Sequence, residues 1–139
     1  MKRVTGIGGV FFKSENPEMI RIWYARHLGI SMQDQHGAVF TWGKDGTDEK
    51  GSTVWSPFKK TTTYFQPSEK DFMFNYRVEN LEALLAALKE EGVQIIGEME
   101  VYEYGKFGWI MDPEGNKIEL WEAVDSAFSK MNDNANPAS

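Results

Sequence analysis

Apolar residues recur at helical spacing in two stretches of the chain. The first stretch begins at Asn16-Pro17, because Asn is a favoured N-cap and Pro suits the first helical position, and it ends at Gly29. Its apolar stripe consists of Ile20, Trp23, Tyr24, His27 and Leu28. The second stretch begins at Asn80, ends at Gly92 and carries Leu81, Leu84, Leu85 and Leu88. This spacing predicts two helices, each with one apolar face against a sheet.

One strand-like run precedes each predicted helix, and three such runs follow it. In the first half they lie at 8–13, 30–33, 38–42 and 52–56, and in the second half at 72–78, 93–98, 102–111 and 116–121. Turn-forming residues predict hairpin turns at 44–46 and 112–115. Each half therefore predicts the element order βαβββ.

The two halves are related by one constant offset. The helix caps Asn16 and Asn80 lie 64 positions apart (80 minus 16), and so do Gly51 and Gly115, which precede the last strands (115 minus 51). Such a repeat indicates duplication of one unit. We predict a single α+β domain over residues 1–124, with module one at about 4–57, a linker at 58–70 and module two at about 71–124. Residues 125–139 have little to bury and are expected to form a flexible tail.

Composition excludes several classes of protein. The chain of 139 residues is 41% hydrophobic and 26% charged, a globular balance, and no apolar run approaches the about 20 residues that cross a bilayer. No Cys is present, which excludes disulfides and thiolate metal sites. A net charge of -6 without a Lys/Arg cluster argues against nucleic acid as a partner. Because residues 1–6 lack a secretory signal, we expect a cytoplasmic protein.

Three stretches resemble a known family. They are GIGGVFF at 6–12, Trp23-Tyr24 with Leu28-Gly29, and DPEGNKIELW at 112–121, of which the last is the most specific. Over residues 5–122 the chain resembles the glyoxalase/bleomycin-resistance/extradiol-dioxygenase group, the vicinal oxygen chelate (VOC) superfamily. The resemblance implies two βαβββ modules that form a cupped, barrel-like mixed sheet with the helices outside, often with a divalent metal at its centre. It also implies a homodimer. Members include isomerases, dioxygenases, thiol transferases and drug-sequestering proteins.

The resemblance further implies where metal ligands would lie. The corresponding positions here are Gly9, Trp55, Met73 and Glu119. Only Glu119 is a usual ligand for a hard or borderline divalent cation, and the two histidines, His27 and His36, lie elsewhere. We therefore expect no metal and no other cofactor, with a divalent metal at Glu119 as the alternative.

Strand alternation gives the residues that would line the cup, if Gly9 and Met73 point inward. The candidate ligand-binding residues are Phe11, Lys13, Trp55, Met73, Asn75, Arg77, Tyr104, Phe107 and Trp121, with Glu119 toward the centre. Aromatic walls with an amide, two cations and one carboxylate are typical of a small-molecule site. Asn75 has a structural alternative, a hydrogen bond within the sheet. Lys13 and Arg77 have the alternative of ordinary surface charges.

Three functions are compatible with these residues. The first is a metal-free protein that binds or sequesters a small aromatic or amphipathic compound, as bleomycin-resistance proteins of the group do. The second is an enzyme, either a metal-independent proton-transfer catalyst with Glu119 as general base or a metal-dependent lyase, isomerase or dioxygenase with atypical ligands. The third is an interaction domain without chemistry. Glu119 has its own alternative, a fold-supporting carboxylate paired with Arg77 or Lys13.

Overall fold

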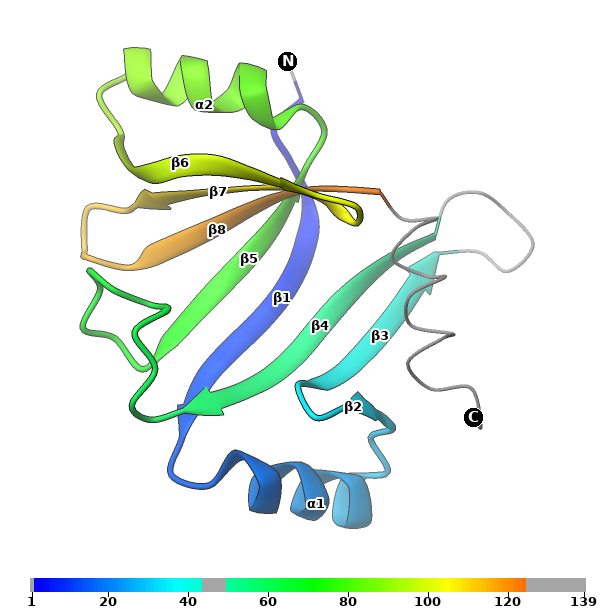
Figure 1. Ribbon diagram of the computed structural model, residues 1–139. Coiled ribbons are helices and arrows are strands. Elements are labelled where there is room, and N and C mark those ends of the chain that lie inside the picture. The colour runs from blue at the N-terminus through cyan, green and yellow to red at the C-terminus, as the bar shows by residue number, and fades with distance from the viewer. Residues whose placement is uncertain (1, 44–49, 125–139) are drawn as a thin grey trace.

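The computed structural model describes residues 2–43 and 50–124 (Figure 1). Its elements are β1 (Val4–Ser14), α1 (Pro17–Leu28), β2 (Met32–Asp34), β3 (Gly37–Gly43), β4 (Lys50–Lys59), β5 (Phe72–Val78), α2 (Leu81–Glu90), β6 (Gln94–Tyr102), β7 (Gly105–Met111) and β8 (Lys117–Ala123). The order βαβββ occurs twice, which confirms the predicted α+β fold. The predicted turn at 44–46 and the predicted tail at 125–139 lie outside the described residues.

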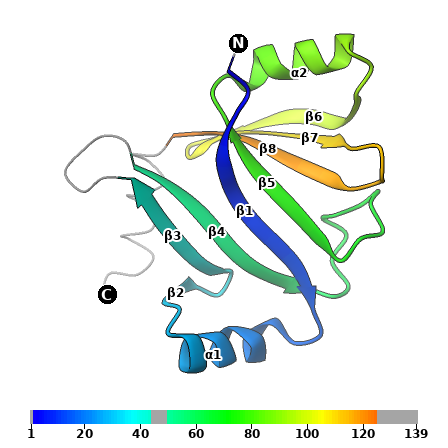
Figure 2. The ribbon, with the colours of Figure 1, turned by 180° about the vertical axis from the view of Figure 1, so that it is seen from behind.

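All eight strands form one curved sheet in the order β2-β3-β4-β1-β5-β8-β7-β6. The modules meet where β1 and β5 pair in antiparallel fashion, and each module repeats one parallel pair, β1 with β4 and β5 with β8. The strands β2 and β6 are the two edges, so the sheet is a cup that is not closed into a barrel. The predicted cupped, mixed sheet is confirmed, and it stays open between these two edges. The helices lie at opposite ends of the cup (Figures 1 and 2).

The apolar stripe of α2 packs as predicted. Leu81 and Leu84 are buried with Val78 and Leu120, and Leu85 and Leu88 pack beside them. The stripe of α1 does not. None of its residues is buried, and Trp23 and Leu28 are 48% and 60% exposed. Only a few side chains of α1 reach the sheet, among them Tyr24, whose ring centroid lies 4.8 Å from that of Trp55.

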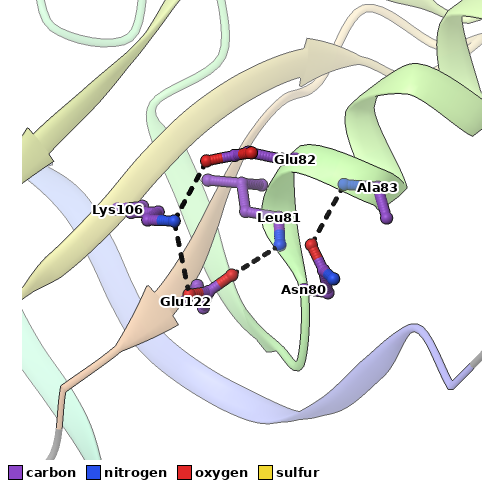
Figure 3. Close-up of polar contacts among 6 residues, drawn as sticks. All are labelled: Asn80, Leu81, Glu82, Ala83, Lys106 and Glu122. Atoms are coloured by element: carbon purple, nitrogen blue, oxygen red, sulfur yellow. Dashed lines mark hydrogen bonds and ion pairs between the residues drawn. The ribbon is translucent and has the colours of Figure 1, made fainter.

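Polar contacts fix the start of α2 on the strands of module two (Figure 3). Asn80 accepts a hydrogen bond from the backbone N–H of Ala83 at 3.1 Å, as its predicted cap role requires. Glu122 on β8 accepts from the Leu81 N–H at 2.8 Å. Lys106 on β7 contacts the carboxylates of both Glu82 (3.0 Å) and Glu122 (3.9 Å). These contacts hold α2 to the two strands that carry much of the concave face.

The hairpin between β6 and β7 differs from the sequence prediction. The predicted strand at 102–111 begins too early, because residues 103–104 form the turn and β6 extends to Tyr102. Gly105, the residue after the turn, has a φ of 140°, and a Cβ there would lie 2.5 Å from the Glu122 carbonyl oxygen. Both facts require glycine at this position. No helix of the described residues is long and apolar enough to span a membrane.

Candidate functional site

Glu119 lies at the centre of the concave face and is only 2% exposed. Strand register places it there, because Asn75 on β5 and Trp109 on β7 are its direct neighbours on the two adjacent strands. Asn75 Nδ2 donates to Glu119 Oε1 at 2.7 Å, and Trp109 Nε1 donates to Glu119 Oε2 at 2.8 Å. The sheet therefore holds the carboxylate through two neutral donors.

A third donor, Tyr64, comes from the linker between the modules. Its hydroxyl donates to Glu119 Oε2. The ring stacks on Phe58, with centroids 5.8 Å apart at 16°, and meets the Trp109 ring edge-on at 6.4 Å and 89°. Burial raises the pKa of Tyr64, and the nearby Glu119 charge raises it further. The phenol is therefore protonated and able to donate at neutral pH.

Phe65, the next linker residue, is completely buried. It packs in the cup with Phe11, Met73 and Trp109. The linker thus fills the space beside Glu119 with two aromatic side chains.

Lys117 is a buried cation that contacts two members of this group, Tyr64 and Trp109. Its Nζ donates to the Tyr64 carbonyl oxygen at 2.7 Å and lies 5.3 Å and 5.7 Å from the ring centroids of Tyr64 and Trp109. Burial lowers the pKa of Lys117, and the negative charges of Glu119 and Glu100 oppose that shift. Three titratable groups, Tyr64, Lys117 and Glu119, therefore meet at the polar centre of the cup.

An aromatic row continues from this centre toward the β6–β7 turn. The guanidinium carbon of Arg77 lies 5.4 Å from the Trp42 ring and 5.1 Å from the Trp121 ring. Phe107 stacks on Trp121 at 5.8 Å and 9°, and Tyr104 meets Phe107 at 5.7 Å and 72°. Cation–π and ring–ring contacts of this kind are favourable, so the row is a rigid wall of the cup.

The structure brings together most of the residues that the sequence suggested. Phe11, Met73, Asn75, Arg77, Phe107, Glu119 and Trp121 face the cup or its wall, Lys13 lies 5.8 Å from the Phe65 ring, and Tyr104 lies at the turn. Trp55 is the exception. It packs on Phe12 and on Tyr24 of α1, outside the cup.

The reason for this exception is a register difference between the modules. Gly9 pairs with Val54, 45 positions on, whereas Asn75 pairs with Glu119, 44 positions on. A one-residue shift reverses which side chains face the cup. Val54 accordingly packs against the cluster of Phe11 inside the cup, and Trp55 lies on the opposite face.

Sequence reasoning missed Tyr64, Phe65 and Trp109. Counting outward from the predicted turn at 112–115 would pair Met111 with Asn116 and misplace Trp109. The loop spans residues 112–116 instead, which pairs Met111 with Lys117 and Trp109 with Glu119. Tyr64 and Phe65 lie in a linker without regular periodicity. No sequence pattern indicates that this linker enters the cup.

The residues at the implied metal positions do not fit a divalent cation. Gly9 offers no side chain, Met73 lies in an apolar cluster, and Trp55 faces away. Glu119 is engaged by three neutral donors. Within residues 2–43 and 50–124, no three His, Cys, Asp or Glu side chains come close enough together to hold a metal ion.

Two clefts lie beside α1 rather than at Glu119. The larger, of about 640 Å³, borders Arg21, His36 and Lys59, and the smaller, of about 350 Å³, lies between Phe12 and Met19.

Comparisons with known proteins agree with this architecture. Residues 14–120 match the model of the family described as "Glyoxalase/Bleomycin resistance protein/Dioxygenase superfamily". Methylmalonyl-CoA epimerase from Mycobacterium tuberculosis is similar in structure, with a TM-score of 0.56, 19% identity, and coverage of 91% of this chain and 93% of that chain. No curated protein sequence matches.

Two further solved structures have the same fold. A Streptomyces coelicolor methylmalonyl-CoA epimerase variant in complex with 2-nitronate-propionyl-CoA has a TM-score of 0.63 and 12% identity, covering 87% of this chain and 99% of that one. A glyoxalase/bleomycin resistance protein/dioxygenase superfamily member from Vibrio splendidus 12B01 has a TM-score of 0.54 and 13% identity, covering 84% and 97%. At these identities the similarity extends to the fold alone.

Proposed function

Because the chain belongs to the glyoxalase/bleomycin resistance protein/dioxygenase superfamily, we propose that its cup binds or sequesters a small aromatic or amphipathic molecule without a metal. Glu119 is the polar anchor of this site. The observation that carries the proposal is a buried carboxylate surrounded by aromatic rings and bonded by three neutral donors, one of which comes from the linker.

The energetics of Glu119 support a functional role. Removing a carboxylate from water costs several kcal/mol. The net free energy of unfolding of a whole domain is only about 5–15 kcal/mol. An apolar side chain would stabilise the sheet without that cost. Strongly perturbed titratable groups gather at functional sites, and here Tyr64 and Lys117 have shifted pKa values beside Glu119. A ligand that needs a buried acceptor explains the arrangement.

The surroundings define the ligand's general character. Trp109 and Trp121, which are buried, and Phe107 would contact a flat molecule that displaces the linker side chains. Arg77 and Lys117 add positive charge along the same wall. The ligand is therefore mainly aromatic, with a polar end directed at Glu119.

A thermal-shift screen against small aromatic compounds tests this proposal. A compound that binds only the folded state must raise the melting temperature. The same compound should lose most of its effect on Glu119→Gln, which keeps the shape and removes the charge. Glu114→Gln, an exposed acid in the turn beyond the site, is the matched control and should behave as wild type. A compound that shifts both variants equally binds elsewhere, and a screen without any shift contradicts the proposal.

An enzyme is the second candidate, favoured by the three titratable groups that meet at the centre of the cup. In this version Glu119 removes a proton next to a carbonyl group, and Lys117 or Tyr64 donates hydrogen bonds to the developing charge. The assay is deuterium exchange at carbon in ligands found by the screen. Exchange catalysed by wild type and lost in Glu119→Gln supports an enzyme, whereas binding without exchange supports a sequestering protein.

Two expectations about the context of the chain stay predictions, a homodimer and a cytoplasmic location. Light scattering of the purified protein tests the first. A mass of one chain at micromolar concentration would contradict it.

A further inference from the structure

Tyr64 occupies the polar centre of the cup in the way that a bound molecule would. The other two donors to Glu119, Asn75 and Trp109, belong to strands that pair with β8 on either side. Tyr64 instead comes from an irregular linker segment, and it is 40% exposed although its hydroxyl reaches a carboxylate that is 2% exposed. Its ring therefore runs from the surface to the buried acceptor.

Almost every contact of the Tyr64 side chain could be made by a free phenol. The ring stacks on Phe58, meets the edge of Trp109 and lies under the Lys117 ammonium group, while the hydroxyl donates to Glu119. Lys117 also donates to the Tyr64 carbonyl oxygen, a backbone contact that a free phenol would not replace. The contacts of the Tyr64 side chain therefore indicate which ligand groups the surrounding residues could bind.

From this we propose that the cup takes a phenol-type ligand, a molecule whose aromatic ring and hydroxyl donor replace those of Tyr64. This inference rests on the proposed binding function and names its ligand class. The hydroxyl is required because a buried carboxylate that loses a donor must find another. An aromatic hydrocarbon supplies none, and an aromatic carboxylate would bring a second negative charge against Glu119.

The direct test is to remove the internal occupant and offer its side chain as a free compound. Tyr64→Ala opens a space that p-cresol, the side-chain analogue of tyrosine, should fill. Toluene has the same ring without the donor, and 4-methylbenzoate replaces the donor with an anion. We expect p-cresol to bind Tyr64→Ala at least about tenfold more tightly than toluene, because a hydrogen bond to a charged group contributes this much. The 4-methylbenzoate ion should not bind detectably.

Tyr64→Phe is the matched control. Its ring still fills the space but no longer donates to Glu119, so p-cresol should bind it more tightly than it binds wild type and more weakly than it binds Tyr64→Ala. Titration calorimetry gives the affinities, and circular dichroism melting shows whether each variant is folded. Wild type should bind p-cresol more weakly than Tyr64→Ala does, because the ligand must displace the tyrosine.

The outcomes separate this inference from the function on which it rests. Folded Tyr64→Ala that binds toluene as well as p-cresol, or binds neither, overturns the phenol assignment. If other compounds still raise the melting temperature of wild type but not that of Glu119→Gln, the proposed binding function stands without the phenol assignment. If no compound shifts wild type or Tyr64→Ala, both fail.

A second measurement covers the case in which Tyr64→Ala does not fold. The indole N–H of Trp109 donates to the same Oε2 atom as Tyr64, and it can be followed by its signal in a nitrogen–proton correlation spectrum of wild type. Displacement of Tyr64 by p-cresol should move that signal, and toluene at equal concentration should not. An unchanged signal at millimolar p-cresol overturns the inference.

Discussion

Replacing Tyr64 by Phe removes one oxygen atom from the centre of the cup and leaves the ring in place. The lost hydroxyl donates to Glu119, a buried charged acceptor that keeps Asn75 and Trp109 as donors. Hydrogen bonds to charged groups contribute about 1.5–3 kcal/mol. Because Tyr64 is 40% exposed and water can reach part of the gap, we expect the lower end, about 1.5 kcal/mol. For a chain of this length the unfolding entropy converts that loss to a melting temperature lower by about 5 °C.

The assay is thermal and urea denaturation of wild type and variant side by side. Tyr102→Phe is the control, since the Tyr102 hydroxyl also donates to a carboxylate, that of Glu100, but on an exposed strand end. Tyr102→Phe should change the free energy of unfolding by less than about 0.5 kcal/mol. In a double-mutant cycle of Tyr64→Phe with Glu119→Gln, the coupling energy should account for most of the expected loss of about 1.5 kcal/mol. The cycle resolves coupling energies of about 0.5 kcal/mol or more. Equal, small losses for Tyr64→Phe and Tyr102→Phe would refute the assignment of Tyr64 as a donor to the site.

Three other predictions concern the same region. Gly8→Ala would place its Cβ 2.2 Å from Asn75 Oδ1, so it should lower the free energy of unfolding by about 1–3 kcal/mol, and an unchanged urea midpoint would contradict this. The raised pKa of Tyr64 means that the folded protein keeps this proton above about pH 10, where an unfolded tyrosine loses it. Stability should therefore fall as pH rises above about 10, and this alkaline fall should be smaller in Tyr64→Phe if the tyrosine causes it. Trp55→Phe should leave the thermal shift from a cup ligand intact while Trp109→Phe reduces it, and the reverse order would place the site on the α1 side of the sheet.

Local patterns were sufficient for the fold of module two. The leucine stripe of α2 has the full helical period and one face to bury, and Leu81 and Leu84 are buried as expected. The stripe of α1 has the same period, but its end residue Leu28 is exposed. Periodicity identifies the apolar face of a helix, whereas the depth of its packing depends on how closely the sheet approaches, which is a tertiary property.

The sequence was sufficient to predict the position of Glu119 but not all of its hydrogen-bond donors. Alternation along the last strand put Glu119 on the concave face, and the neighbouring strand put Asn75 beside it. Tyr64 lies 55 positions from Glu119 in the chain, in a linker that forms hydrogen-bonded turns at 63–66 and 65–68 but belongs to no repeat. Loops have no regular hydrophobic spacing from which their path could be predicted. A residue that completes a buried network from such a loop leaves no local signal in the sequence.

Strand register and residue type together explain why the described part of the cup has one buried acid instead of two. By the 64-residue offset Trp55 is the counterpart of Glu119, yet the shift of one position in the β1–β4 pair turns Trp55 outward and Val54 inward. Ser56 instead pairs with Phe11, the counterpart of Asn75, so module one has a buried serine rather than an acid at the equivalent place. A ligand anchored at Glu119 must accordingly lie against β5, β7 and β8 with its apolar part toward Phe11, so variants on the concave face of module two should affect binding more than those of module one.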